Sequence, residues 1–183
     1  MNVIASRGQL RASFIRWALF TVPLIVLLGF VAGQVGGGPT TFWFQNLVKP
    51  GIFPEPKWFG IVWSILYVLI GFSLALVCSA WGARGRGLAI GLFAVHFLLN
   101  LAWSPVFFGT QNIMGGLIVI ALVDVTLLIV IWAFWRVRRA AALLLLPYLA
   151  WVLFATLLNY EFLQANPDGG HGDGPPASQR FEI

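Results

Sequence analysis

The chain has 183 residues, of which 60% are hydrophobic and only 9% are charged, and its mean hydropathy is +0.89. A soluble domain carries roughly 25% charged residues, so these values exclude an ordinary water-soluble protein and predict a chain surrounded mainly by lipid. The net charge of +5 comes from basic residues in short clusters between apolar runs, a distribution that orients membrane helices and does not favour nucleic-acid binding.

The N-terminal residues 1–16 form a basic segment that contains three arginines and precedes an apolar stretch starting at Trp17. A basic region followed by an apolar one also occurs in cleaved signal peptides. This stretch lacks a clear small-x-small cleavage site, so we interpret it as the first membrane helix.

Five apolar segments follow one another along the chain: Trp17–Val35, Trp58–Ala80, Leu88–Phe108, Ile113–Trp135 and Ala141–Gln164. Each approaches the ~20 residues that a helix needs to cross about 30 Å of hydrocarbon. Backbone groups in lipid must be paired within the protein, which favours helices. The prediction is an all-α integral membrane protein with a five-transmembrane-helix bundle as its single domain, residues 17–166.

The connections between these segments are short, except for residues 40–57. This loop is rich in proline and contains Trp43 and Phe44, so we expect it to lie over the membrane interface, where aromatic rings gather. The other connections are short enough to force antiparallel neighbours. Residues 167–183 are rich in glycine and proline, and they are predicted to form a disordered tail.

The distribution of Lys and Arg predicts the orientation in the membrane. Eight arginines would lie on the side of the N-terminus, whereas Lys49, Lys57 and Arg180 would lie opposite. Because basic residues stay on the cytoplasmic side, the N-terminus is predicted to be cytoplasmic, and the first loop and the C-terminus to be outside. The eight are Arg7, Arg11, Arg16, Arg84, Arg86, Arg136, Arg138 and Arg139.

The polar residues at membrane depth include Asn100, His96 and Asp124. Asn100 is costly to leave unpaired in lipid and should face the bundle interior, as a link between helices or as a ligand contact. His96 could ligate a haem iron, although a hydrogen bond to a neighbour is the more common role of such a histidine. Asp124 must be protonated or paired, and structural pairing is the simpler expectation.

The sequence contains no paired carboxylates at helical spacing, no Cys/His cluster and no glycine-rich phosphate loop. We therefore assign no catalytic residue, no metal ligand and no required cofactor. Cys78, which lies in an apolar run, is expected to be a small buried hydrophobic residue.

Several aromatic residues repeat at helical spacing. Trp63 and Tyr67 share one helix face, Asn100 and Trp103 share another, and Trp151 lies on the fifth segment. Together they could line one aromatic pocket with a few hydrogen-bonding groups, suited to a flat apolar ligand with polar edges. The alternative is that tryptophans form belts at the two membrane interfaces. That alternative fits those near segment ends: Trp17, Trp58, Trp81, Trp132 and Trp135.

Two pairs of glycines occur at a spacing that allows helices to approach closely. Gly29 and Gly33 lie on the first segment, and Gly87 and Gly91 lie at the start of the third. The second pair could form a homodimer contact or could pack inside the bundle.

Four motifs together resemble the TspO/MBR family, the tryptophan-rich sensory or translocator proteins. They are Lys49-Pro50 in the first loop, the segment from Gly60 to Tyr67, the segment from Asn100 to Gly109, and the segment from Pro147 to Tyr160. The resemblance extends from about Trp43 to Asn166. It implies a five-helix bundle, usually a homodimer, with a cavity under the first loop that binds porphyrins and, in some members, sterols and synthetic ligands.

The resemblance also implies which residues contact the ligand: Trp43, Phe44, Trp63, Tyr67, Asn100, Trp103 and Trp151. Lys49 and Lys57 would be the nearest cations for porphyrin propionates. The chain departs from the family in the first loop, where Pro54-Glu55-Pro56 replaces adjacent prolines. No Lys or Arg closely follows Tyr160, so sterol binding is not predicted.

The expected function is a tetrapyrrole-binding membrane protein that acts in transport, sensing or stress regulation, with a porphyrin or haem as the ligand, as a homodimer, and without nucleic acid. One alternative is an enzyme that directs light-driven porphyrin breakdown, with tryptophans at the ring. Another is a structural scaffold whose aromatic residues only pack, which would have a filled bundle and no cavity under the loop.

Overall fold

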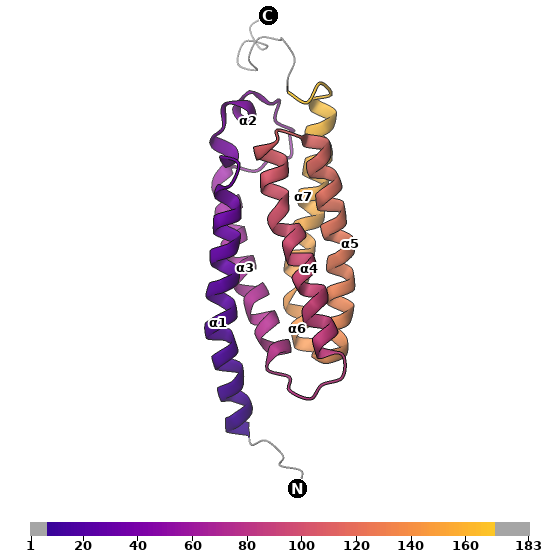
Figure 1. The fold of residues 1–183 in the computed structure, drawn as a ribbon. Helices are drawn as coiled ribbons and strands as arrows, with labels where there is room; N and C mark the ends of the chain where they lie inside the picture. The colour runs from indigo at the N-terminus through magenta and orange to yellow at the C-terminus, as the bar shows by residue number, and fades with distance from the viewer. Residues whose placement is uncertain (1–6, 171–183) are drawn as a thin grey trace, which may run out of the picture.

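The computed structural model describes residues 7–170, and every regular element in that range is helical. Five helical segments are long and apolar enough to cross a membrane, as predicted. In Figure 1 they run side by side, and the start of α1 and the end of α7 lie at opposite ends of the bundle. The elements are α1 (Arg7–Gln34), the short η1 (Gly38–Thr40), α2 (Phe42–Asn46), α3 (Pro56–Cys78), α4 (Arg86–Ser104), η2 (Pro105–Gly109), α5 (Ile113–Val137), α6 (Arg139–Leu144) and α7 (Leu146–Ala165).

The first helix begins at Arg7 rather than at the predicted Trp17. The extension is held because its side chains have partners: Phe14 stacks on Phe72 of α3 at 6.3 Å, and Ser13 is buried. Most of the predicted basic segment is therefore helix. Residues 1–6, and residues 171–183 of the predicted tail, lie outside the described part of the chain.

Two prolines coincide with interruptions of the membrane helices. Pro105 has no backbone N–H to donate, and the chain widens there into the π-turn η2, in which the Thr110 N–H donates to the Pro105 carbonyl at 3.0 Å. Pro147 lies in the first turn of α7, directly after the break at Leu145 that separates α6 from α7. The fifth membrane crossing is thus two helices joined by a bend.

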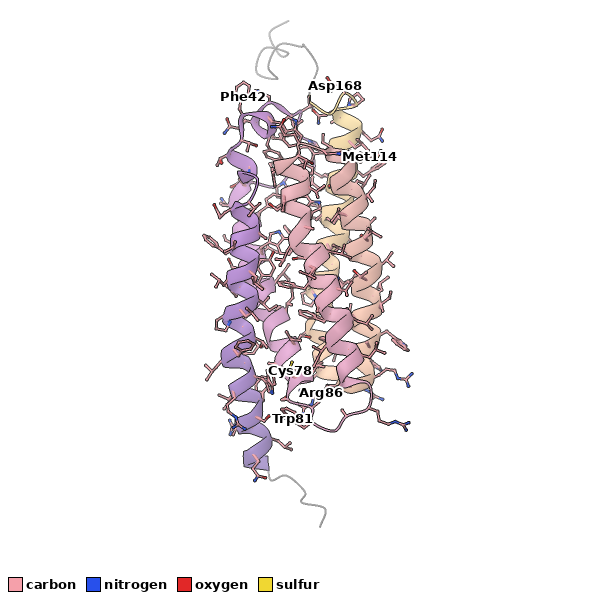
Figure 2. All side chains as sticks on the ribbon, viewed as in Figure 1. Phe42, Cys78, Trp81, Arg86, Met114 and Asp168 are labelled. Carbon is pink, nitrogen blue, oxygen red and sulfur yellow. The ribbon has the colours of Figure 1, made fainter. Side chains whose placement is uncertain are left out.

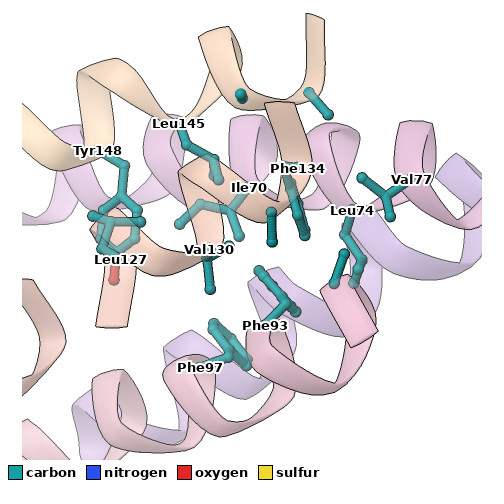
Figure 3. Close-up of a cluster of buried hydrophobic side chains, with 14 of the residues drawn as sticks. Ile70, Leu74, Val77, Phe93, Phe97, Leu127, Val130, Phe134, Leu145 and Tyr148 are labelled. Carbon is teal, nitrogen blue, oxygen red and sulfur yellow. The ribbon is translucent and has the colours of Figure 1, made fainter. Parts of the chain in front are cut away.

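The half of the bundle that contains the α3–α4 connection has a filled core, shown in Figure 3. Leu127 and Phe134 have no exposed surface, and the Phe93 ring stacks on Phe97 and Phe134 at 5.7 and 5.8 Å. A Cβ at Gly71 would lie 2.7 Å from the Val22 Cα. Helices α1 and α3 therefore meet here at backbone distance.

The two ends of the bundle differ in charge. Figure 2 places Trp81 and Arg86 at one end, and Phe42 and Asp168 at the other. The α3–α4 connection, the start of α1 and the α5–α6 junction share the first end, which carries the clustered arginines. This alternation agrees with the predicted topology, while the side of the membrane on which each end lies stays a prediction.

Candidate ligand-binding cavity

A cavity of about 560 Å³ lies between the helices in the half nearest the 40–57 loop. All five crossings and the loop contribute to its wall. The aromatic part of the wall consists of Phe30, Phe44, Phe53, Phe59, Trp63, Tyr67, Trp103, Phe107, Phe108 and Phe162. The polar side chains in the wall are Gln34, Ser64, Asn100, Ser104 and Asn159.

Small residues and the π-turn explain why this half is hollow. Gly29 and Gly33 of α1, together with Gly60 of α3, line the cavity without any side chain to fill it. A Cβ at Gly29 would lie 2.3 Å from the Tyr67 ring, so the glycine is what allows this ring its place in the wall. In η2, Phe107 and Phe108 both face the cavity, and Phe107 stacks on Trp103 at 5.0 Å.

A chain of hydrogen bonds leads from the cavity wall into the filled core. The Tyr67 hydroxyl donates to Asn100 Oδ1 at 3.5 Å, and Asn100 Nδ2 donates to the Tyr148 hydroxyl at 2.8 Å. The Tyr148 hydroxyl contacts His96 Nε2 at 3.2 Å, and His96 Nδ1 contacts Thr126 Oγ1 at 2.9 Å. These five side chains join α3, α4, α5 and α7.

The contacts fit a single direction along this chain. The Thr126 hydroxyl donates to the Leu122 carbonyl at 2.8 Å, so its oxygen is left to accept from His96 Nδ1–H. The neutral imidazole then has a free acceptor at Nε2, which takes the Tyr148 hydrogen. The Tyr148 oxygen in turn accepts from Asn100, and this fixes the amide so that Oδ1 faces Tyr67 at the cavity.

A second amide is fixed in the same way near the loop. Asn159 Oδ1 accepts from Trp103 Nε1 at 3.2 Å, and its Nδ2 donates to the Ile113 carbonyl at 2.9 Å. Asn159 is 2% exposed and lines the cavity. Two asparagines with fixed orientations thus offer defined polar positions in an otherwise aromatic wall.

The model of the TspO/MBR family matches residues 21–164, most of the chain. The chain belongs to the TspO/MBR family. Tryptophan-rich protein TspO of Chlorobaculum tepidum is 39% identical over 147 residues, which cover 80% of this chain and 93% of that protein. The tryptophan-rich sensory protein of Cereibacter sphaeroides is 33% identical over 159 residues, covering 82% and 92%. The human translocator protein is 36% identical over 134 residues, covering 72% and 79%.

Of the seven ligand contacts implied by the resemblance to the TspO/MBR family, five lie in the cavity wall: Phe44, Trp63, Tyr67, Asn100 and Trp103. The other two lie behind it. The Trp43 ring packs on Phe107 at 5.6 Å, and the Trp151 ring packs edge-on against Phe59 at 5.8 Å. Their contact with a ligand would therefore be indirect, through the phenylalanines that they support.

The loop over this TspO/MBR cavity is fastened to the end of α7. The Asn166 side chain accepts from the Val48 N–H at 2.8 Å and donates to the Val48 carbonyl at 3.0 Å. Trp43 Nε1 donates to the Gly169 carbonyl at 3.1 Å. The segment around α2 is thus a fixed cover over the cavity, and Phe44 reaches the cavity from it.

Neither lysine of the predicted propionate site lines the cavity. The Lys49 ammonium donates to the carbonyls of Phe44, Gln45 and Leu47 and lies 4.5 Å from the Phe44 ring centroid. Burial lowers the pKa of Lys49 from its ordinary value of 10.5, while the carbonyls favour its charged form. Lys57 is exposed and forms an ion pair with Glu55.

His96 does not offer a free nitrogen to a haem iron. Both ring nitrogens are engaged by Tyr148 and Thr126, and the side chain is 1% exposed and away from the cavity wall. Asp124 Oδ2 accepts from the Thr156 hydroxyl at 2.7 Å, which meets the expected pairing for one oxygen, while the buried Oδ1 has no hydrogen-bond partner among the described residues. Across residues 7–170, no group of three His, Cys, Asp or Glu is placed to hold a metal.

Sequence reasoning missed several residues of the wall. Asn159 could have been found by the argument applied to Asn100, because it is a polar residue at membrane depth. Phe59 and Phe108 carry no comparable signal, since phenylalanines in a membrane helix are as often exposed to lipid. Gly29 was interpreted as a residue that lets two helices pack closely. Its role beside the Tyr67 ring could not be predicted, because that ring belongs to a different helix, α3.

Proposed function

We propose that this TspO/MBR protein binds a tetrapyrrole in the cavity under the 40–57 loop, in transport, sensing or stress regulation. The observation that carries the proposal is the wall itself, which lines about 560 Å³ with aromatic rings and with asparagines at fixed orientations. Pockets of 300–1,000 Å³ with mainly apolar walls and few polar groups suit drug-sized ligands. A planar macrocycle with polar atoms fits this chemistry.

Binding would depend mainly on apolar burial. Removing the macrocycle faces from water contributes roughly 25 cal/mol per Å², and the rings of Trp63 and Trp103 offer large surfaces against which it can stack. Tyr67 and Asn100 supply the orientation, because the Tyr67 hydroxyl can donate to a propionate oxygen once its long contact with Asn100 Oδ1 gives way. Since 3.5 Å is at the outer limit for a hydrogen bond, that exchange costs little.

The names of the relatives and the cavity favour this proposal over a scaffold. Two matching proteins are named for sensing or translocation, and a pure scaffold requires a filled bundle at the position where the cavity lies. Reversible binding serves both transport and sensing.

The test is a titration of the purified protein with protoporphyrin, followed by absorbance and tryptophan quenching. Trp63→Ala should weaken binding about tenfold, or about 1.4 kcal/mol, because the ring lines the cavity and supports Tyr67 at 5.1 Å. Trp132→Ala is the matched control, since that ring is 58% exposed near the far end of α5. Equal affinities of wild type and Trp63→Ala for protoporphyrin would show that Trp63 does not contact the ligand, and would contradict the proposed binding geometry.

We further propose a homodimer through the start of α4. Gly87 and Gly91 are exposed, and a Cβ at either would meet nothing within 4 Å, while Val95 and Leu98 continue the open apolar surface. Small residues at this spacing allow two helices to approach closely in lipid.

Gly91→Leu should convert a dimer into a monomer, measured by light scattering in detergent. Ala121→Leu is the control, because Ala121 is exposed on α5, away from the proposed contact. A dimer that survives Gly91→Leu, or a wild-type protein that is already monomeric, would contradict this interface.

A further inference from the structure

A second recess lies at the basic end of the bundle, away from the cavity. It has a volume of about 380 Å³ and is lined by Ser13, Arg16, Trp17, Phe20 and Trp81. Four of these residues come from the first half of α1, and Trp81 comes from the α3–α4 connection. Figure 2 shows Trp81 at the end of the bundle that also carries Arg86. The recess therefore lies where a helix emerges from lipid into a basic surface.

The wall formed by Trp81 is held in place although its ring is 67% exposed. Its Nε1 donates to Ser13 Oγ at 3.2 Å, and the Arg86 guanidinium lies 4.3 Å from its ring centroid. The centroid of the Trp17 ring lies 6.4 Å from that of the Trp81 ring. Arg86 is itself fixed, because it donates twice to the Cys78 carbonyl at 2.8 and 3.1 Å. These contacts hold the exposed Trp81 indole in one position, so this wall of the recess is preorganised.

Arg16 brings an uncompensated charge to this recess. Its exposed guanidinium has no hydrogen bond, ion pair or ring contact with any residue of the 7–170 range. The four acidic residues in that range lie elsewhere: Glu55 before α3, Asp124 within α5, and Glu161 and Asp168 at the end of α7 and after it. The basic end thus offers donors for an anion and, in the described part of the chain, no carboxylate that would repel one.

We propose that this recess binds the phosphate of an anionic membrane lipid. Guanidinium groups bind phosphate oxygens with two parallel hydrogen bonds, and Arg16 is free to do so. Trp17 and Trp81 would flank the headgroup at interface depth, where indoles concentrate. Phe20, one turn further into the membrane on α1, would contact the beginning of the acyl chains.

The charge distribution also selects the type of headgroup. Phosphatidylcholine and phosphatidylethanolamine carry a cation next to the phosphate, and the guanidinium groups of Arg16 and Arg86 would repel that cation. Phosphatidylglycerol carries an uncharged glycerol next to its phosphate. The recess should therefore prefer the anionic lipid, independently of whether the other cavity binds a tetrapyrrole.

The experiment measures lipid binding to the full-length protein in detergent by native mass spectrometry, with palmitoyl-oleoyl phosphatidylglycerol and phosphatidylcholine added separately. Wild type should bind the anionic lipid more tightly, and Arg16→Gln should weaken that binding about fivefold, the effect of one basic residue near a membrane surface. Arg11→Gln is the matched control, because Arg11 is an exposed arginine on the same helix that does not line the recess. Glycerol phosphate in place of lipid distinguishes a site for a free phosphate from one that also needs the acyl chains.

Three outcomes would overturn the proposal: equal binding of the two lipids by wild type, equal losses in Arg16→Gln and Arg11→Gln, or competition by glycerol phosphate as strong as that by the lipid. Trp81→Phe provides a second readout, since it keeps an aromatic ring but removes the bond to Ser13. It should also weaken lipid binding while leaving the helical circular dichroism unchanged. Intact lipid binding in that variant would exclude Trp81 as a wall of the site.

Discussion

The two halves of the bundle are built from the same helices but are packed in opposite ways. Along α3, the half near the loop presents Gly60 and Trp63 to a cavity, whereas the other half presents Ile70, Leu74 and Val77 to a filled core. In the filled half, aliphatic side chains interdigitate with the stacked rings of Phe93, Phe97 and Phe134. In the hollow half, glycines of α1 and α3 leave the space between the rings empty.

The boundary between the halves is polar. Asn100 faces the cavity, and Tyr148 and His96 follow it into the core as one hydrogen-bonded chain. Polar groups at this depth must be paired, and here the pairing also orients the group that meets the cavity. Residues of the filled half thus determine the orientation of the Asn100 amide that faces the cavity.

The largest effect should come from making the filled half hollow. Leu127→Ala removes a side chain with no exposed surface, so it should cost about 2–5 kcal/mol of unfolding free energy by leaving a cavity. Leu101→Ala is the matched change in the hollow half, where Leu101 already borders the cavity. Its cost should stay below about 2 kcal/mol, because little new void is created. Unfolding in a denaturing detergent measures both, and equal costs would mean that the two halves are packed alike.

The next effect should come from cutting the polar chain. His96→Leu leaves the Tyr148 hydroxyl and the Thr126 oxygen without their partner, at a cost of about 1–3 kcal/mol. His96→Gln can still accept from Tyr148 with its amide oxygen and donate to Thr126 with its nitrogen, so it should restore most of the stability and of the protoporphyrin affinity. The experiment compares both properties across the two variants. If His96→Gln is no better than His96→Leu, the hydrogen bonds do not orient Asn100.

These contrasts show which parts of the molecule can be predicted from sequence. The five crossings follow from hydropathy and length, because lipid imposes one rule on every helix. The wall residues Trp63 and Asn100 followed from helical spacing and from the TspO/MBR motifs. Trp151 was predicted in the wall but lies behind the Phe59 ring. The position of that ring depends on how α3 and α7 pack, and the spacing of residues along one helix does not contain this information.

A smaller effect should come from altering the wall at Gly29. Gly29→Ala places a methyl group 2.3 Å from the Tyr67 ring, so the ring must move and its contact with Asn100 is lost. We expect protoporphyrin affinity to fall about tenfold, within the 1–3 kcal/mol range of overpacking. Gly33→Ala is the control four residues later, where a Cβ meets nothing within 4 Å. Calorimetric titration of both variants measures the difference, and an equal loss at Gly33 would show that any methyl group on this face of α1 blocks the site.

The smallest effect concerns the two lysines at the rim of the hollow half. Lys49 already donates to three carbonyls, whereas Lys57 has an exposed ion pair with Glu55, which contributes at most about 1 kcal/mol, and lies 5.8 Å from the Trp58 ring centroid. A propionate can therefore recruit Lys57 more easily. Lys57→Met should reduce the preference for protoporphyrin over its uncharged dimethyl ester about two- to threefold, in line with one exposed charge pair. Lys49→Met should change that preference less, because the ammonium is committed to the end of α2. Titration of both lysine variants with the acid and the ester separates the two. A larger change at Lys49 would mean that its carbonyl contacts give way to the ligand, and that the cover over the cavity rearranges on binding.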